Sequence, residues 1–267
     1  MLILLSPAKS LDYESKLATR KRSEPRLLDR SMELIEVMRQ KTVDEVSDLM
    51  GISLELAEIN VRRYVDFHVP FTRATARPAV LAFDGGVYQG MNAKHAFDER
   101  DFTEAQKTIR ILSGLYGVLR PLDLVMPYRL EMGIKLHTAA GDTLYDYWGR
   151  TITDVLNADL AVSPGPALVV NLASGEYFRS VETSALDGTL VSPRFLDQGP
   201  DGDYRIVSFF AKYARGAMAG WLVRNRVRSA RALRSFDGAG YRFDPARSSR
   251  SQPTFLRDRQ DQPAAAG

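Results

Sequence analysis

Two short apolar runs set the strongest limit on how this chain can fold. Residues 1–5 read MLILL, and residues 167–172 read ALVVNL, with adjacent valines. Short runs that lack a polar alternation are typical of strands that are buried on both faces of a sheet. We therefore expect each run to form a buried strand that the rest of the chain must cover.

Further strands and helices alternate irregularly along the sequence. We expect strands at 79–83, 109–115, 189–195 and 204–207, and helices after Glu24-Pro25, from Thr42 to Gly51, from Ser53, from Thr103, and over 143–157 and 209–226. The regular strand–helix–strand alternation of a doubly wound fold is missing, so the pattern predicts an α+β fold with a mixed β-sheet flanked by helices. The length allows one domain or two. We predict a single compact domain over 1–255 and a flexible tail over 256–267, whose last residues, PAAAG, should fray.

Composition excludes several classes of protein. Hydrophobic residues make up 45% and charged residues 26% of the 267, which is typical of a soluble globular protein. No apolar stretch approaches the roughly 20 residues of a membrane-spanning helix, and the start lacks a basic leader. We expect a cytoplasmic protein that does not bind membranes. The chain has no cysteine, which excludes disulfides, thiolate nucleophiles and cysteine-bound metal clusters.

The basic residues are concentrated near the C-terminal end. Residues 205–259 hold thirteen lysines or arginines against three acids, although the net charge of the whole chain is only +3. Five arginines fall within residues 224–234, in a segment predicted to be helical, so several should share one face. Such a cluster favours nucleic-acid binding. The alternative is a solvated face on which arginine merely replaces lysine.

A pair of helices at about 42–66 resembles the helix-hairpin-helix element of DNA-repair proteins. Thr42 and Glu45 form a capping box, Gly51 ends the first helix, and Ser53 caps the second. The free amides of such a turn favour an anion such as a DNA phosphate. A second glycine is expected where Ser53 stands, so a purely structural hairpin is the alternative. The predicted DNA-binding residues are Gly51, Ser53, Arg224, Arg226, Arg228 and Arg231.

Polar side chains also gather near the ends of the predicted strands. SPAKSLD follows the first strand and NLASGEYF includes the end of the strand at 167–172, positions where loops of α/β proteins carry function. Lysines, arginines and tyrosines of this kind can hold phosphate groups. The predicted pocket residues are Lys9, Asp12, Tyr88, Arg120, Tyr128, Arg129, Glu131, Asn171, Ser174, Lys212 and Arg215. The alternatives are a salt-bridged turn for Lys9 with Asp12 and an ion pair for Arg129 with Glu131.

The sequence contains no fingerprint of a specific reaction. Neither GxGxxG, a phosphate-loop pattern nor a GxSxG elbow occurs, and His68, His95 and His137 lie far apart. We therefore predict neither a cofactor nor a resident metal, and no catalytic residue is assigned.

Five segments resemble the peroxide stress resistance protein YaaA family, in order and across residues 1 to about 255. They are SPAKSLD, LAFDGGVYQG at 81–90, LSGLYGVLRPLDLVMPYRLEMG at 112–133, VVNLASGEYF at 169–178 and FFAKYARGAMAGWLVRNR at 209–226. The resemblance implies a cytosolic protein of the hydrogen peroxide response that keeps unincorporated iron low. It also implies a mixed α/β fold, a basic cleft and a helix-hairpin-helix element, here mapped to residues 49–60.

Three functions follow as hypotheses. The first is binding of double-stranded or branched DNA through a basic cleft, largely without sequence preference, which helps to limit damage from unincorporated iron. The second is an enzyme that acts on a phosphorylated or nucleotide-like small molecule in a pocket lined by lysine and arginine. The third is iron sequestration by oxygen ligands such as Asp12, Glu131 and Glu176. The sequence leaves open whether there is a reaction and in which oligomeric state the chain works.

Overall fold

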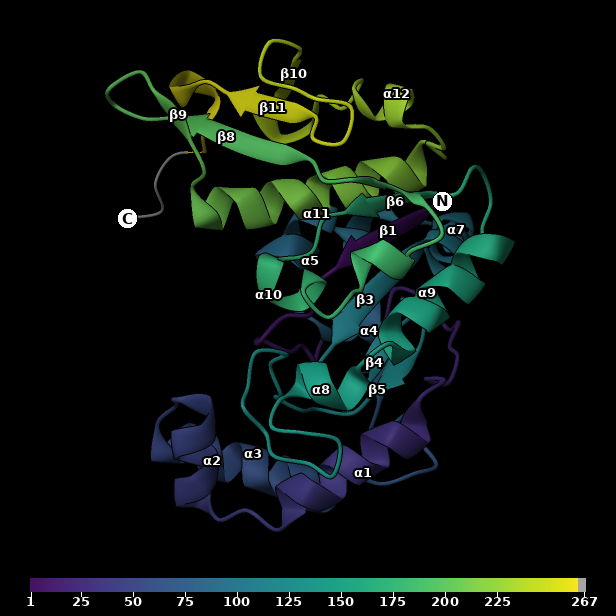
Figure 1. The fold of residues 1–267 in the computed structure, drawn as a ribbon, viewed down its shortest axis with the longest axis vertical. Helices are drawn as coiled ribbons and strands as arrows, with labels where there is room; N and C mark the ends of the chain where they lie inside the picture. The colour runs from purple at the N-terminus through teal and green to yellow at the C-terminus, as the bar shows by residue number, and fades with distance from the viewer. Residues whose placement is uncertain (264–267) are drawn as a thin grey trace.

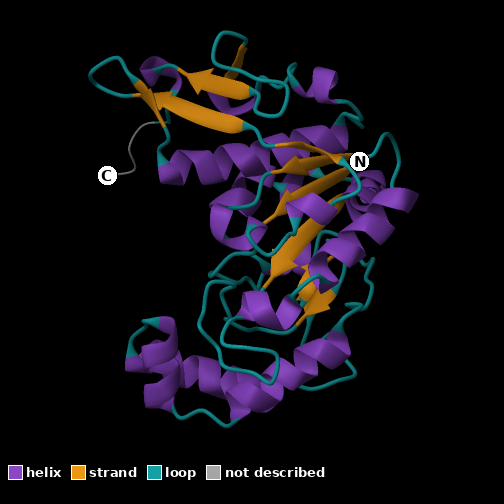
Figure 2. Cartoon of the chain, in the orientation of Figure 1, coloured by secondary structure: helices purple, strands orange, loops and turns teal. Residues whose placement is uncertain are grey.

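A five-stranded mixed sheet forms the centre of the computed structural model, which describes residues 1–263. The strand order is β4-β3-β1-β6-β7. The strands are β1 (Leu2–Leu5), β3 (Ile109–Ser113), β4 (Gly117–Leu119), β6 (Leu168–Asn171) and β7 (Thr189–Val191). All pairs are parallel except β3 with β4. The predicted mixed sheet flanked by helices is therefore confirmed (Figure 2).

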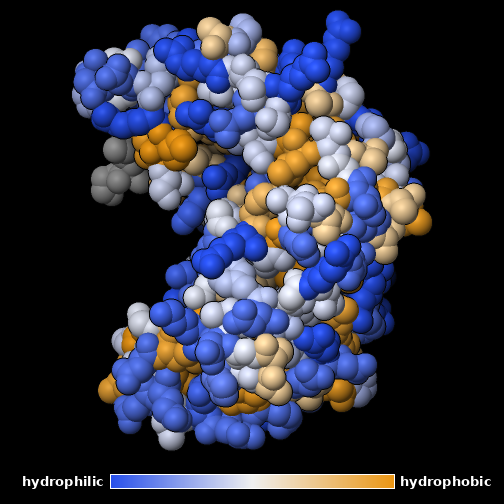
Figure 3. Space-filling view, in the orientation of Figure 1, coloured by the Kyte–Doolittle hydropathy of each residue, from blue (hydrophilic) through white to orange (hydrophobic). Residues whose placement is uncertain are grey.

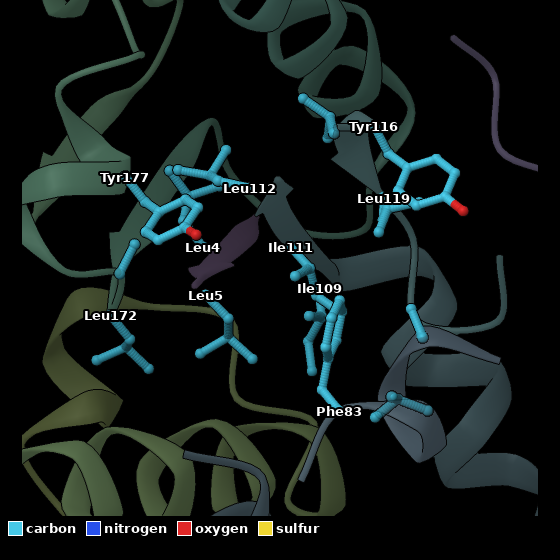
Figure 4. Close-up of a cluster of buried hydrophobic side chains, with 14 of the residues drawn as sticks. Leu4, Leu5, Phe83, Ile109, Ile111, Leu112, Tyr116, Leu119, Leu172 and Tyr177 are labelled. Atoms are coloured by element: carbon cyan, nitrogen blue, oxygen red, sulfur yellow. The ribbon is translucent and has the colours of Figure 1, made fainter. Parts of the chain in front are cut away.

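The two apolar runs of the sequence are neighbouring strands. Leu4 of β1 is paired with Asn171 of β6, and β1 is buried along its whole length. Figure 4 shows Leu4 and Leu5 among the side chains of β3, with Leu172 and Tyr177 nearby. Because β1 and β6 run parallel, the loops after Leu5 and after Asn171 leave the same edge of the sheet.

A second sheet lies above the long helix α11 (Ser208–Arg224) in Figure 1. Its strand order is β10-β11-β8-β9, with β8 (Arg194–Gln198), β9 (Tyr204–Arg205), β10 (Arg242–Asp244) and β11 (Thr254–Arg257). Near it lie α12 (Ala230–Leu233) and the 3-10 turns η2 (Gly238–Gly240) and η3 (Arg259–Asp261). Asp197 and Arg257 form a buried ion pair of 2.7 Å that joins β8 to β11.

Three helices form the opposite end of the molecule (Figure 1). They are α1 (Leu28–Arg39), α2 (Val43–Met50) and α3 (Leu54–Asp66). The capping box of Thr42 with Glu45, the left-handed Gly51 (φ 59°) and the cap at Ser53 are confirmed. The side chain of Arg39 donates to the carbonyl of Tyr64 at 2.9 Å, which fixes α3 against α1.

The remaining helices surround the central sheet. They are α4 (Ala79–Ala82), α5 (Gly86–Met91), α6 (Ala93–Ala96), α7 (Glu99–Thr108), α8 (Leu144–Trp148), α9 (Thr151–Val162), α10 (Gly175–Phe178) and the 3-10 turn η1 (Thr183–Ala185). Two short strands, β2 (Arg77–Pro78) and β5 (Leu124–Val125), pair beside them. Glycines allow α5 and α11 to touch, because a Cβ at Gly90 or Gly216 would overlap backbone of the facing helix.

Several predicted elements differ in the structure. Residues 79–83 were predicted as a strand, but α4 forms there because the amides of Ala79 and Val80 bond to the loop before β5. The helix predicted from Thr103 starts at Glu99, capped by Asp98. The single helix predicted over 143–157 is divided at Gly149, where φ is 46°.

The strand predicted over 189–195 is divided between the two sheets. Its first half is β7 in the central sheet, and its second half is β8 in the upper one. The helical segment predicted over 224–234 is interrupted, because α11 ends at Arg224 and Arg226 has a φ of 51°. Residues 256–261, which were assigned to a flexible tail, contain the end of β11 and the 3-10 turn η3. The last four residues of PAAAG lie outside the described residues.

Candidate functional site

A pocket of about 430 Å³ opens where the loops after β1 and β6 leave the central sheet. Helices α5, α10 and the first half of α11 contribute to its walls. These elements border the hollow side of the molecule, which Figure 3 shows between the upper sheet and the lower helices. The lining residues are Ser6, Pro7, Ala8, Lys9, Ser10, Gly85, Gly86, Val87, Tyr88, Tyr128, Arg129, Leu130, Glu131, Leu172, Ser174, Glu176, Tyr177, Lys212 and Arg215.

Four cationic side chains meet in this pocket from three distant segments. Lys9 comes from the loop after β1, Arg129 from the loop after β5, and Lys212 and Arg215 from one face of α11. The Lys9 side chain is 68% exposed, whereas that of Arg129 is only 17% exposed. Burial lowers the pKa of the Arg215 guanidinium. The cations therefore lie at different depths, because Lys9 and Lys212 are exposed whereas Arg129 and Arg215 are half-buried.

Two carboxylates balance part of this charge. Glu131 Oε1 lies 3.2 Å from Lys9 Nζ and 2.9 Å from Arg129 Nη2. The other oxygen, Oε2, is buried and has no hydrogen-bond partner among the described residues. Glu176 Oε1 accepts from the amide of Gly133 at 3.0 Å. With four cations against two carboxylates, the pocket suits an anionic group.

Neutral hydroxyls and close loop packing form the rest of the wall. Tyr88 donates to the carbonyl of Ser6 at 3.0 Å, and the amide of Ser174 donates to the Ser6 hydroxyl at 2.9 Å. Burial raises the pKa of Tyr88, so its hydroxyl stays protonated and acts as a donor. Gly85 lies so close to Ala8 that a Cβ there would be 2.9 Å from the alanine Cβ. These contacts hold the loop after β1 in place.

Most of the predicted pocket residues come together. Those that line the pocket are Lys9, Tyr88, Tyr128, Arg129, Glu131, Ser174, Lys212 and Arg215. Ser6, Gly85, Glu176 and Tyr177 also line the pocket; they were not among the predicted pocket residues, although they belong to the same motifs. Their position in loops that follow buried strands was the signal by which they could have been predicted as pocket residues.

Three predicted residues do not line the pocket. Asp12 bonds to Lys94, Arg77 and Ser15, and the hydrogen bonds from Lys94 and Ser15 outweigh burial and hold the pKa of its carboxyl well below the usual range. Arg120 is paired with the buried Asp123 at 2.8 Å. Asn171 accepts from the amide of Ala173 at 3.0 Å and so caps the end of β6. The ion pair expected for Arg129 with Glu131 is present, while Lys9 pairs with Glu131 rather than with Asp12.

The predicted cluster of DNA-binding arginines is partly neutralised. Arg226 Nη1 lies 2.7 Å from Asp101, and Arg228 is bonded to Glu104, both acids being on α7. Arg224 and Arg231 are exposed, but they lie on separate elements around the break after α11. The helical segment on which several of these arginines were expected to share a face is therefore interrupted after Arg224.

The helical hairpin of α2 and α3 has an acidic surface. Residues 42–66 hold six carboxylates against two arginines. The amide of Ile52 is already bonded to the carbonyl of Ser47 at 3.1 Å, and Leu54 and Ile59 are exposed. The two helices do pack as a hairpin, but a role for Gly51 and Ser53 at a DNA phosphate stays a prediction.

The described residues contain neither a metal-binding cluster nor a membrane-spanning helix. Between Met1 and Pro263, no group of three or more histidine, aspartate or glutamate side chains is placed to hold a metal ion. Glu131 and Glu176 both line the pocket, whereas Asp12 lies elsewhere, so the three oxygen ligands proposed for iron are not assembled. Over the same residues, the helices are too short or too polar to span a membrane.

Comparisons with known proteins extend over almost the whole chain. The sequence profile of a family described as "Peroxide stress protein YaaA" matches residues 1–247. A "UPF0246 protein" of Cellvibrio japonicus (strain Ueda107) is 46% identical over 258 residues, which cover 97% of this chain and 99% of the relative. The matched range includes every residue that lines the pocket.

Proposed function

Because the chain belongs to the peroxide stress protein YaaA family, as its motifs predicted, we propose that it serves the peroxide stress response by binding DNA. The binding surface would be the basic pocket and the hollow side around it. The ligand would be double-stranded or branched DNA, bound with little sequence preference. A further part of the proposal is that such binding limits damage from unincorporated iron.

The convergence of Lys9, Arg129, Lys212 and Arg215 is the observation that supports this function most strongly. Glu131 pairs with Lys9 and Arg129 only, so the four cations are not fully compensated, and phosphate oxygens are the ligands that suit them best. Lys9 and Lys212 would reach a backbone phosphate first because both side chains are exposed. Contacts to phosphate carry affinity but little sequence information, which accounts for the expected lack of sequence preference.

Displacement of cations from DNA offers a physical link to iron. A protein that neutralises phosphates releases the cations condensed around them. Ferrous ions held on the DNA backbone would be released with the other counterions, so peroxide would react with iron further from the bases. This route needs no iron site in the protein itself.

The proposal assigns the principal contacts to the pocket rather than to the predicted arginine cluster. Arg226 and Arg228 are engaged by Asp101 and Glu104, so they have less charge to offer a phosphate. The acidic hairpin would repel a DNA backbone unless its turn amides outweighed its carboxylates. Arg224 and Arg231 remain secondary candidates.

A DNA-binding titration with two pocket variants tests the function. We expect the double variant Lys9→Glu with Lys212→Glu to weaken binding of a labelled duplex and of a four-way junction by a similar factor, about 100-fold at about 100 mM salt. The control is Lys107→Glu with Lys135→Glu, which changes the net charge equally at two exposed lysines outside the pocket. Equal affinities of the two double variants would overturn the proposal.

A small phosphorylated or nucleotide-like ligand is the second candidate, with an enzymatic activity if one exists. The observation that favours it is the size of the pocket, since about 430 Å³ lies within the range of roughly 300 to 1,000 Å³ that is common for small-molecule sites. The position beyond the carboxyl ends of β1 and β6 is also common for such sites. Calorimetric titration with inorganic phosphate and with nucleoside monophosphates tests it. Competition between these ligands and DNA would place both at the pocket.

A further inference from the structure

A second basic surface lies in two loops outside the pocket. Its five cations are Lys16, Arg20, Lys21, Arg22 and Arg73. Together with Leu17, Thr19, Ala76, Pro78 and Leu124 they enclose a shallow cavity of about 270 Å³. We call it the basic loop surface. It shares no residue with the pocket.

The segments that carry these cations contain no acidic residue, although Glu14 and Glu24 flank the first of them. Residues 15–23 and 67–78 contain neither aspartate nor glutamate. Lys21 pairs with Glu99 at 3.1 Å, whereas the other four cations form no ion pair with any described residue. Uncompensated charges that are held close together repel one another, so their placement destabilises the fold unless an anion binds.

Hydrogen bonds hold the two loops in place. The buried hydroxyl of Thr19 donates to Glu99 at 2.8 Å, and Lys21 donates to Thr103 at 2.7 Å. Thr72 and Thr75 bond to one another across the turn that carries Arg73. The cations are therefore presented on a fixed backbone, which lowers the entropy cost of binding.

The shape and charge of this surface favour a polymer of phosphates over a small ligand. A cavity of about 270 Å³ is below the common range for small-molecule sites, about 300 to 1,000 Å³. Three of the five cations are arginines, whose planar fork suits phosphate. A phosphate backbone offers several successive charges to a cluster of cations, with no need for a deep cavity. Nucleic acid is thus the occupant with the best fit.

The two basic surfaces lie on different parts of the molecule. The pocket is built by α5, α10 and α11, whose pocket parts are on the left of Figure 1, whereas the basic loop surface lies beside β5 and the start of α7, on the right. We propose that the basic loop surface binds a second segment of DNA, so that one chain bridges two duplexes. Binding of the first duplex at the pocket rests on the proposed function. Binding of the second duplex at the basic loop surface does not depend on it.

A bridging assay with matched variants tests the inference. Beads that carry one duplex are incubated with the full chain and a second, fluorescent duplex, and the retained fluorescence is measured. The test variant is Arg20→Glu with Arg22→Glu and Arg73→Glu; all three side chains are exposed, and circular dichroism confirms folding. The control variant is Arg62→Glu with Arg150→Glu and Arg205→Glu, which alters exposed arginines elsewhere by the same charge.

We expect the test variant to lose most of the bridging while its affinity for a single duplex falls by less than about tenfold, and the control variant to bridge like the wild type. Bridging by the test variant at the wild-type level would overturn the inference, as would a wild type that binds one duplex but never retains a second. If the wild type retained an acidic polypeptide on the beads in place of DNA, the inference would also be wrong. If the Lys9 and Lys212 variant bound a single duplex normally and the test variant did not, the proposed function would fail while the second site stood.

Discussion

Lys9 and Glu131 form an ion pair of 3.2 Å at the pocket, although they come from separate loops and Glu131 is only 13% exposed. The carboxylate orders the cations but also repels a phosphate that approaches them. Glu131→Gln keeps an oxygen that can accept from Lys9 and Arg129 and removes the negative charge. We expect affinity for DNA to rise about fivefold at low salt, equal to about 1 kcal/mol, with a smaller gain at high salt because added ions screen the charge.

The matched control for this change is Glu55→Gln on the hairpin. Glu55 is exposed in the first turn of α3, so its removal changes the net charge of the chain equally. Fluorescence anisotropy at two salt concentrations measures both variants. An equal rise in affinity for Glu55→Gln would mean that the DNA runs near the hairpin, in contradiction to the contacts proposed for the pocket.

A buried carboxylate joins α9 to the segment just before α1 and to β3, and it makes the fold sensitive to acid. Asp159 bonds to Arg26 at 2.6 Å and to Arg110 at 2.5 Å, and Arg110 is only 4% exposed. Asp159→Asn leaves the Arg110 charge without its partner. We expect the free energy of unfolding at neutral pH to fall by about 3 kcal/mol, measured by urea titration.

The pKa of Asp159 sets the pH dependence of that loss. Burial alone would raise the pKa of this carboxyl, but hydrogen bonds from Arg26 and Arg110 outweigh burial and lower the pKa below the ordinary 3.8. A carboxyl whose pKa is depressed in the folded state stabilises the fold above its unfolded pKa, and this stability is lost as the pH falls through the folded pKa. The difference between wild type and Asp159→Asn should therefore be constant from about pH 7 to about pH 5 and shrink below about pH 4. A difference that grows in acid would contradict this assignment.

Local signals in the sequence were enough to predict the strands and caps that depend on near neighbours. The runs at 1–5 and 167–172 are apolar because both faces of β1 and β6 are covered, and the capping box at Thr42 is complete within four residues. The strand predicted at residues 79–83 was wrong, because a run of four or five apolar residues fits a strand and a helical turn equally well. There the choice is made by hydrogen bonds to Asp123 and Pro121, which no local pattern reveals.

Charge was harder to predict than fold because its partners are distant in sequence. Residues 224–234 contain no acid, yet Arg226 is paired with Asp101, which lies 125 positions away. The pocket was predicted better, since loops that follow parallel strands must emerge at one edge of the sheet. The basic loop surface was missed because its cations are divided between two loops that become neighbours only after folding.

The contact between α5 and α11 depends on the absence of side chains at two glycines. A Cβ at Gly216 would overlap the carbonyl oxygen of Val87, which is backbone and cannot turn away. We expect Gly216→Ala to lower the free energy of unfolding by about 3 kcal/mol, because α5 must move away from α11. DNA affinity should fall as well, since Lys212 and Tyr88 lie on these two helices.

Gly175→Ala provides the control for this change. Gly175 lies in α10, its φ is not in the left-handed region, and a Cβ there would have no neighbour within 4 Å. Thermal unfolding should place this variant at or slightly above the wild type, because alanine favours a helix over glycine by about 1 kcal/mol. If both variants unfolded like the wild type, the close packing of α5 on α11 would not be required for stability.

The distribution of sulfur suits a chain that must work in the presence of peroxide. There is no cysteine, and six of the eight methionines are buried, namely Met1, Met38, Met91, Met126, Met132 and Met218. Met32 and Met50, on α1 and α2, are only half-buried. Oxidation of methionine follows its exposure, so peptide mass spectrometry after graded hydrogen peroxide should find sulfoxide first at these two positions.

Oxidation at Met32 and Met50 should leave the pocket intact, because neither residue lines it. We expect the affinity for DNA to change by less than about twofold until the buried methionines react, since sulfoxide in a core disrupts packing whereas sulfoxide at a half-buried position is tolerated. The double variant Met32→Leu with Met50→Leu should bind DNA like the wild type and show no sulfoxide under mild treatment. Early oxidation of Met91, which lies on α5 against α11, would instead show that the core opens around the pocket under these conditions.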